Sequence, residues 1–323
     1  MKVFALSLIT LAVVIVLAIS FGSEPVSLAK ALSDSTSLDH VIVFEVRLPR
    51  VLLGAVAGAG LSVVGAALQA MLRNALAEPF VLGVSGGSAV GATFAILIGV
   101  SSASIIPLFA LAGGLGTTAL VHVIASAVKS DRGVSTLLAG IVMNAMASAL
   151  ITLVKVLVTQ SKAQELLFWL TGFLDVPSTS ALFAMTVYVG AGVLILLRDA
   201  GRLNVLALGI SAAEHLGVSV RGLERRIYLA GALVVGAIVS FTGLIGFIGL
   251  LVPHALRRVV GPDVRVLMPA SIGFGGAALV LCDLVSRASF RWIHREPPVG
   301  AITALLGGSL FIYLLVKGRR SAT

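Results

Sequence analysis

The chain has 323 residues, of which 58% are hydrophobic and 11% are charged, and its formal net charge is +9. Soluble domains carry about 25% charged residues, so the composition excludes a soluble globular protein. Its apolar runs are continuous and lack two-residue alternation, which excludes a membrane barrel of strands, so we expect an all-α polytopic membrane protein with a single domain over residues 1–323.

The first apolar run covers residues 3–21 and follows Lys2. A basic residue before an apolar core is typical of a secretory signal peptide, but no convincing small-residue cleavage site follows here. Because the rest of the chain is repeatedly apolar, we interpret this run as the first membrane-spanning helix. A polar segment, residues 22–47, leads to the second one.

The second predicted helix, residues 50–72, contains about 22 consecutive uncharged residues, which is enough to cross a bilayer. Small residues recur at every fourth position of this helix: Gly54, Gly58, Ser62, Ala66 and Ala70. Such a stripe allows the backbone of another helix to approach closely. A Gly-rich run at 83–88 follows; no lysine accompanies it, so it predicts close helix packing or a flexible elbow rather than phosphate binding.

Four further spans are predicted at residues 80–99, 105–128, 134–157 and 178–197. The fourth and fifth helices carry His122 and Lys155, ionisable residues that are unusual within a membrane segment. Between the fifth and sixth helices, residues 158–177 are half apolar and contain Trp169. We expect this segment to form a short helix that lies at the outer surface or dips back into the membrane.

The longest inner loop, residues 198–226, is too polar to span a membrane. Ser211 and Glu214 match an S-x-x-E capping box, which predicts a short helix that begins at Ser211, and Gly217 is placed to end it. A capped helix with exposed apolar residues is typical of a docking element for a cytosolic partner. An amphipathic loop resting on lipid headgroups is an equal alternative.

The last four predicted spans are residues 227–241, 243–256, 266–286 and 299–316, which brings the total to ten and places both termini on one side. If that side is the cytoplasm, it holds 15 of the 23 basic residues and six of the 14 acidic ones. The whole positive excess then lies inside, as the positive-inside rule requires. The net positive charge therefore indicates how the chain is oriented in a cytoplasmic membrane, and it does not indicate binding to nucleic acid.

The sequence contains no nucleotide-binding motif, catalytic triad, paired carboxylates or metal-ligand spacing. We therefore expect no catalytic residue, no metal site and no cofactor in this chain. Three arginines, Arg47, Arg50 and Arg287, are predicted where spanning helices meet the outer face. They could reach lipid phosphates, or they could dock onto acidic residues of an external protein, since the arginine fork suits carboxylates.

Several motifs together resemble the FecCD family, the permease subunits of ABC importers for iron–siderophore complexes, haem and cobalamin. They follow the family's order across nearly the whole chain: RLPR at 47–50, LQAMLRNALAEPFVLGVSGG at 68–87, LLAG at 137–140, LALG and LGV within 206–218, GFIGLLVPHALRRVVGPD at 246–263, and PVGAITALLGGSLFIYLL at 298–315.

This resemblance implies a type II ABC importer permease with ten helices that forms a homodimer, with two cytosolic ATPase subunits below it and an extracytoplasmic substrate-binding protein above it. It implies that ATP is used by the partner subunit. By position, Arg47, Arg50 and Arg287 match arginines that engage the binding protein. The loop contacts with the ATPase match Gly209, Ser211, Ala213, Glu214, Leu216 and Gly217, and the positions near the cytoplasmic gates match Asn74, Leu76, Ser135 and Thr136.

We therefore expect a permease subunit that moves an iron chelate of the iron–siderophore type by alternating access. A haem or cobalamin permease of the same family is the alternative. An ion-coupled secondary transporter is a rival of another class; such proteins usually place ionisable residues in mid-membrane, and this chain offers only His122 and Lys155.

Overall fold

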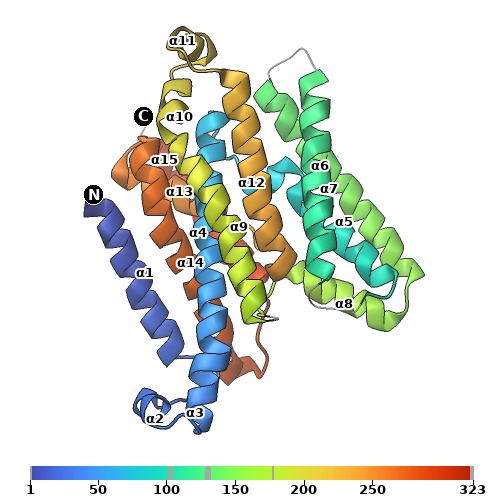
Figure 1. Ribbon diagram of the computed structural model, residues 1–323, viewed down its shortest axis with the longest axis vertical. Helices are drawn as coiled ribbons and strands as arrows, with labels where there is room; N and C mark the ends of the chain where they lie inside the picture. Colours follow the sequence, from blue (N-terminus) through green and yellow to red (C-terminus); the bar gives the residue numbers. More distant parts are fainter. Residues whose placement is uncertain (1, 101–104, 128–131, 177, 321–323) are drawn as a thin grey trace.

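The computed structural model describes residues 2–100, 105–127, 132–176 and 178–320, and these residues form helices joined by short loops (Figure 1). Lys129 and Asp131, two residues of the predicted inner face, lie outside this part of the chain. The helices in chain order are α1 (Lys2–Ser20), α2 (Leu28–Ser33), α3 (Leu38–His40), the π-helix η1 (Val41–Arg47), α4 (Leu48–Met71), the 3₁₀-helix η2 (Pro79–Leu82), α5 (Val84–Leu97), α6 (Ile106–Ala127), α7 (Arg132–Leu157), α8 (Gln160–Thr171), α9 (Thr179–Arg198), α10 (Ala200–Leu206), α11 (Ile210–His215), α12 (Val220–Thr242), α13 (Ile248–Val260), α14 (Val264–Ile293) and α15 (Val299–Arg320).

The predicted spans correspond, in order, to α1, α4, α5, α6, α7, α9, α12, α13, α14 and α15. Within the described chain, seven helical stretches are long and apolar enough to cross a membrane. Helix α5 is apolar but has only 14 residues, and α13 has only 13, whereas α15 runs for 22 residues. The prediction of an all-α polytopic protein is confirmed, and the short helices α5 and α13 complete the bundle by packing on longer neighbours.

Helix α4 is the centre of the molecule, because most of its side chains are buried and it contacts α14, α13, α9 and α12. Small residues explain this packing. A side chain at Gly58, a member of the predicted stripe, would collide with the Gly275 carbonyl of α14. Gly65 lies outside the stripe, and a side chain there would collide with the Gly249 carbonyl of α13. Gly58 and Gly65 thus bring three backbones of one chain together.

The segment after α4 reverses the chain within the bundle. Arg73 adopts a left-handed conformation with a φ of 48°, and the amide of Asn74 donates to the Gln69 carbonyl at 3.2 Å, so α4 ends in a Schellman turn. Gly83, with a φ of 75°, then starts α5. The predicted close packing of the Gly-rich run is confirmed, because a side chain at Gly87 would collide with Gly113 and Thr117 of α6.

Two ends of the bundle differ in character (Figure 1). Helices α10 and α11 project at one end, and α2 and α3 lie at the opposite end together with α8. Helix α1 begins and α15 ends in the half of the molecule that carries α10 and α11. The short helix predicted within 158–177 is α8, and it follows the long helix α7 directly.

The predicted start of the eighth helix at 243 is wrong, because Gly243 with a φ of 65° ends α12 and α13 begins only at Ile248. Two other predicted boundaries fail at charged residues. Helix α14 continues to Ile293, past the predicted end at 286, and α12 begins at Val220, where a loop to 226 was expected. Charged residues set both expected boundaries. The helices continue through them because Asp283 pairs with Arg287 in α14 and Arg226 of α12 pairs with Asp199. A charged residue that has an ionic partner therefore does not have to end a helix.

Candidate functional site

The projecting unit α10–α11 contains the residues predicted to contact an ATPase. Helix α11 begins at Ile210 after Gly209, whose φ is 117°, and no side chain caps it. The predicted start at Ser211 is therefore wrong, because glycine at 209 lets the chain enter the helix one residue earlier. Ser211 and Glu214 are exposed residues within α11, while Ala213 is buried against the protein.

The predicted end of α11 is confirmed. Gly217 has a φ of +79°, its amide donates to the Glu214 carbonyl at 3.0 Å, and the Val218 amide donates to the Ala213 carbonyl at 2.9 Å. This pair of bonds is a Schellman motif. Three large apolar side chains, Leu208, Ile210 and Leu216, are exposed around it. The unit therefore presents a rigid apolar surface away from the helix bundle.

Helix α10 is held to the bundle by an aspartate that the sequence reading did not single out. Asp199 is 2% exposed, and its carboxylate accepts hydrogen bonds from Arg226 Nε of α12 at 2.7 Å and from Arg202 Nη1 at 2.5 Å. Burial opposes the ionisation of Asp199, but the two arginines outweigh it and keep its pKa below the usual 3.8. The i,i+3 spacing of Asp199 and Arg202 was a signal that could have found it.

A second link joins α10 to α14. The amide of Asn204 donates to Asp263 at 2.5 Å, and its carbonyl oxygen accepts the Val264 amide at 2.8 Å. Asp263 also caps α14, since it accepts the Arg265 amide at 2.9 Å. Hydrogen bonds from Arg265 and Asn204 lower the pKa of Asp263 to about 2. Movement of α10 is thus tied to both α12 and α14.

The predicted gate residues lie on two different elements. Asn74 and Leu76 belong to the turn after α4, where the Asn74 side chain accepts the Leu76 amide at 2.9 Å and leaves Leu76 exposed. Ser135 and Thr136 lie in the first turns of α7. The Tyr228 hydroxyl of α12 donates to the buried Thr136 hydroxyl at 3.2 Å.

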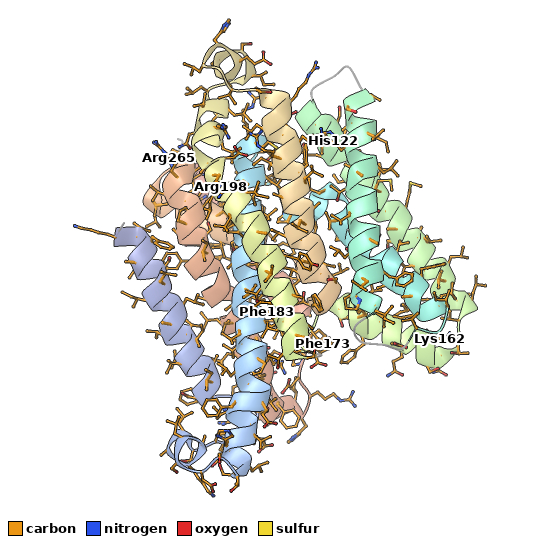
Figure 2. The ribbon with its side chains drawn as sticks, in the orientation of Figure 1. His122, Lys162, Phe173, Phe183, Arg198 and Arg265 are labelled. Carbon is orange, nitrogen blue, oxygen red and sulfur yellow. The ribbon has the colours of Figure 1, made fainter. Side chains whose placement is uncertain are left out.

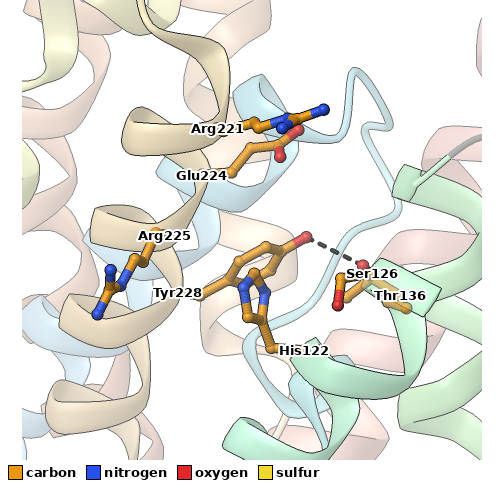
Figure 3. Close-up of a pocket in the computed structure, with 8 residues that line it drawn as sticks. His122, Ser126, Thr136, Arg221, Glu224, Arg225 and Tyr228 are labelled. Carbon is orange, nitrogen blue, oxygen red and sulfur yellow. Dashed lines mark hydrogen bonds between the residues drawn. The ribbon is translucent and has the colours of Figure 1, made fainter.

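Thr136 lines a cavity of about 490 Å³ between α6, α7 and α12 (Figure 3). The rings of His122 and Tyr228 lie 5.5 Å apart in its wall. Arg221, Glu224 and Arg225 border it from α12. His122, which stood out in the sequence, therefore lies beside one of the predicted gate residues.

At the opposite end, the three predicted docking arginines join α1, α4 and α14. Arg47 is 4% exposed, and its guanidinium donates to the carbonyls of Ile19 at 2.8 Å and Glu24 at 2.5 Å. Arg287 is equally buried and donates to the Ala18 carbonyl at 2.9 Å. These bonds satisfy the end of α1, so both side chains are directed into the chain.

Arg50 and Arg287 share one acidic partner. The fully buried Asp283 accepts Arg50 Nε at 2.9 Å and Arg287 Nε at 2.8 Å, and Arg50 also pairs with Glu296 at 2.9 Å. Asp283 and Glu296 together balance the charges of Arg50 and Arg287. Of the three arginines, Arg50 retains the largest exposed area.

Asn144 of α7 is a further polar residue that the sequence reading missed. Its carbonyl oxygen accepts the Gly86 amide at 3.1 Å, and its amide donates to the Phe80 carbonyl at 2.9 Å. It therefore holds α7 to η2 and the start of α5. A polar residue opposite a Gly-rich run was the available signal. Among the described residues, no group of three or more His, Cys, Asp or Glu side chains could hold a metal ion.

Comparison with known proteins agrees with this arrangement. The profile of the FecCD transport family matches residues 10–317. The cobalamin import system permease protein BtuC of Halobacterium salinarum is 42% identical over 282 residues, covering 85% of this chain and 73% of that protein. The Fe(3+)-citrate import system permease protein YfmD of Bacillus subtilis is 32% identical, covering 99% of this chain and 96% of that protein.

A solved structure has the same fold. It is described as an inward-facing conformation of a metal-chelate type ABC transporter, and it superimposes with a TM-score of 0.88 at 30% identity. The match covers 98% of this chain and 99% of that chain.

Proposed function

The chain belongs to the FecCD transport family of ABC permeases, and from this premise we propose that it imports an iron chelate of the siderophore type by ATP-driven alternating access. The observation that carries the proposal is the projecting α10–α11 unit, which Asp199 and Asn204 tie to α12 and α14. A partner that moves this unit would tilt both helices. The family match favours this mechanism over an ion-coupled transporter.

We place the α10–α11 end in the cytoplasm, with both termini on that side. Arg198 and Arg265 lie toward this end (Figure 2), Arg202 lies in α10, and Arg226 of α12 pairs with Asp199 at the start of α10. The positive-inside rule supports this orientation. The exposed residues Leu208, Ile210 and Leu216 would then face a cytosolic ATPase, which performs the hydrolysis, so we assign no catalytic residue to this chain.

The substrate is proposed from the relatives. Their names cover ferric citrate and cobalamin, both of which are metal chelates. An iron chelate is our first assignment, and cobalamin or haem is the alternative. The permease in this proposal receives its cargo from an extracytoplasmic binding protein, which determines much of the selectivity.

We also propose that two copies of the chain surround the pathway. Large apolar side chains are exposed along α7, including Ile141, Met146 and Leu150, and along α15, including Leu306 and Leu310. A second copy would cover these faces and place Leu76, Ser135 and Thr136 beside the pathway between the copies, where they would act as the inner gate.

Docking of the binding protein on Arg47, Arg50 and Arg287 remains a proposal. Because Arg47 and Arg287 are engaged inside the chain, the sharper test uses Arg50. We expect Arg50→Glu to weaken capture of the binding protein while ATPase assembly persists. Arg291→Glu, an exposed arginine on α14, is the matched charge reversal. Unchanged capture by Arg50→Glu would remove the docking role.

The proposed function is tested by purification and transport. The permease should co-purify with an ATPase subunit encoded beside it. Proteoliposomes that contain the permease, this ATPase and its binding protein should accumulate a radiolabelled ferric chelate only with ATP. Uptake that follows an ion gradient without ATP would contradict the proposal, and cobalamin or haemin uptake without iron-chelate uptake would select the alternative substrate.

A further inference from the structure

A hollow of about 590 Å³ lies at the end of the molecule opposite α11. It is bordered by α8, by the segment after α8, by the start of α6 and by the end of α12. Lys162 of α8 donates to the Leu97 carbonyl of α5 at 3.1 Å, and this bond holds α8 in place. Figure 2 shows Lys162 and Phe173 in this region. The contact between α8 and α5 therefore fixes the position of the helix that forms one wall of the hollow.

Aromatic rings form one side of this hollow. Phe168 and Phe173 stack with their centroids 4.0 Å apart and their planes within 2°, and Trp169 lies beside them. Phe168 is nevertheless 62% exposed. An exposed stacked pair offers a flat apolar surface that is suited to the organic shell of a bulky ligand.

The charges around these rings are acidic. A second hollow of about 440 Å³ adjoins the first, since Phe168, Phe173 and Asp175 line both. Glu165 borders the first hollow, and Glu45 and Glu296 border the second. We call the two hollows together the outer trough.

Lys162 does not line the trough, and its ammonium donates to the Leu97 carbonyl; the positive charge within the described lining is already neutralised. Among the trough's described lining residues the basic one is Arg50, whose guanidinium pairs with Asp283 and Glu296. Glu165 and Asp175 are exposed. An anionic ligand would therefore approach the aromatic surface against uncompensated carboxylates, and a neutral or cationic ligand would not.

We propose that the outer trough selects the substrate class: it accepts neutral or cationic metal chelates with an apolar shell and disfavours anionic ones. Phe168, Trp169 and Phe173 contact the shell, and Glu165 and Asp175 set the charge preference. The assignment rests on the proposed function, in which this end receives the cargo. It concerns the permease itself and is independent of the selectivity of the binding protein.

The test uses the fluorescence of Trp169. The chain has two tryptophans, and the second, Trp292, is 81% exposed on α14, so Trp292→Phe leaves Trp169 as the reporter. The full chain in nanodiscs is titrated with ferrichrome, a neutral ferric hydroxamate, and with ferric citrate, an anionic chelate. Free N-acetyltryptophanamide corrects for light absorption by each chelate.

We expect ferrichrome to quench Trp169 at a concentration about tenfold lower than ferric citrate, as two nearby carboxylates at a protein surface would produce. Glu165→Gln with Asp175→Asn should bring the two concentrations within about threefold. Asp34→Asn with Glu24→Gln changes the net charge equally, and both residues are exposed outside the trough, so this variant should retain the tenfold ratio.

Equal quenching by both chelates, no quenching by either, or an unchanged ratio in the Glu165–Asp175 variant would overturn the inference. The ATP-dependent uptake assay reports separately on the proposed function. Charge-selective quenching without ATP-driven uptake would leave the trough assignment standing and remove the importer. ATP-driven uptake with no charge preference at Trp169 would support the importer and remove the trough assignment.

Discussion

Gly217 is the residue on which the shape of the projecting unit depends most directly. Its φ of +79° is a conformation that costs residues with a Cβ about 1 kcal/mol or more, yet no atom lies within 4 Å of where a Cβ would be. Backbone conformation, and not space, therefore requires glycine here. The same holds for Gly209 at the start of α11.

We predict that Gly217→Ala weakens ATPase binding about fivefold, because the left-handed turn that orients Leu216 becomes strained. Binding of the purified ATPase to the permease in nanodiscs measures the effect. Gly201→Ala is the matched control, since Gly201 also has open space but lies within α10 without a positive φ. Equal losses in both variants would show that the turn is unimportant.

Asn144 has a comparable role inside the membrane. Its side chain satisfies the Gly86 amide and the Phe80 carbonyl, two backbone groups at a helix start. We predict that Asn144→Ala destabilises the protein by about 1–3 kcal/mol, because the Gly86 amide loses its side-chain partner where water is excluded and the Phe80 carbonyl keeps only the Gly83 amide. Thermal unfolding in detergent measures the loss. Ser148→Ala, one turn further along α7 and exposed, should unfold at the parental temperature.

At the scale of elements, α10 connects the projecting unit to the bundle. Asp199 binds it to α12, and Asn204 binds it to the start of α14. A short helix cannot remain folded through its own hydrogen bonds, so these links determine its position. They make α10 the element through which a force on α11 would reach the membrane helices.

We predict that Asp199→Asn separates ATP hydrolysis from transport. The variant keeps the shape of the side chain but loses the charge that holds Arg202 and Arg226. ATPase subunits should still bind. The amount of chelate taken up per ATP hydrolysed should fall about fivefold or more, because the charge-assisted hydrogen bonds that link α10 to α12 are lost. Arg198→Gln removes an exposed charge next to Asp199 and should keep the parental ratio. A parental ratio in Asp199→Asn would exclude the link.

The link to α14 carries a defined pH dependence. The pKa of Asp263 is lowered from 3.8 to about 2 in the folded chain, so its stabilising effect is fully present above about pH 3.8 and is lost as the pH falls through about 2. We predict that the Tm difference between the parent and Asp263→Asn is constant near neutral pH and shrinks between about pH 4 and pH 2. A difference that does not change over this range would contradict the assignment.

The elements were predictable where one local rule dominated. Continuous apolar runs located the spanning helices, and Gly217 located the end of α11. The wrong boundaries of α12 and α14 have a common cause, which is that charged residues find ionic partners. Arg226 of α12 pairs with Asp199, which is distant in the sequence, and Asp283 of α14 pairs with Arg287, one turn away. The roles of Asp199, Asn204 and Asn144 also depend on contacts between elements, which periodicity does not encode. For the same reason, the sequence predicted that Arg47 and Arg287 lie at the outer face but did not show that both are buried.

At the scale of the whole molecule, the chain exposes apolar surface on all sides, but a membrane protein exposes such surface both to lipid and to protein. Leu17 of α1 and Leu310 of α15 are 40% and 43% exposed, so exposure alone does not separate them. Their elements differ, because α1 packs on the outside of α14, whereas α15 contacts α13, α14 and α8. The proposed homodimer requires that α15 faces a second copy and α1 faces lipid.

This requirement gives the last prediction. Leu310→Gln should reduce the dimer fraction about tenfold or more, because glutamine cannot reproduce the apolar packing between two copies at a two-fold interface, where each substitution occurs twice. Leu17→Gln inserts the same group into a lipid-facing helix and should leave the dimer fraction unchanged, at a similar cost in membrane stability. Native mass spectrometry of the detergent-solubilised permease counts the copies. A dimer that survives Leu310→Gln but is lost in Leu17→Gln would place the interface on α1 and move the pathway to the other face of the bundle.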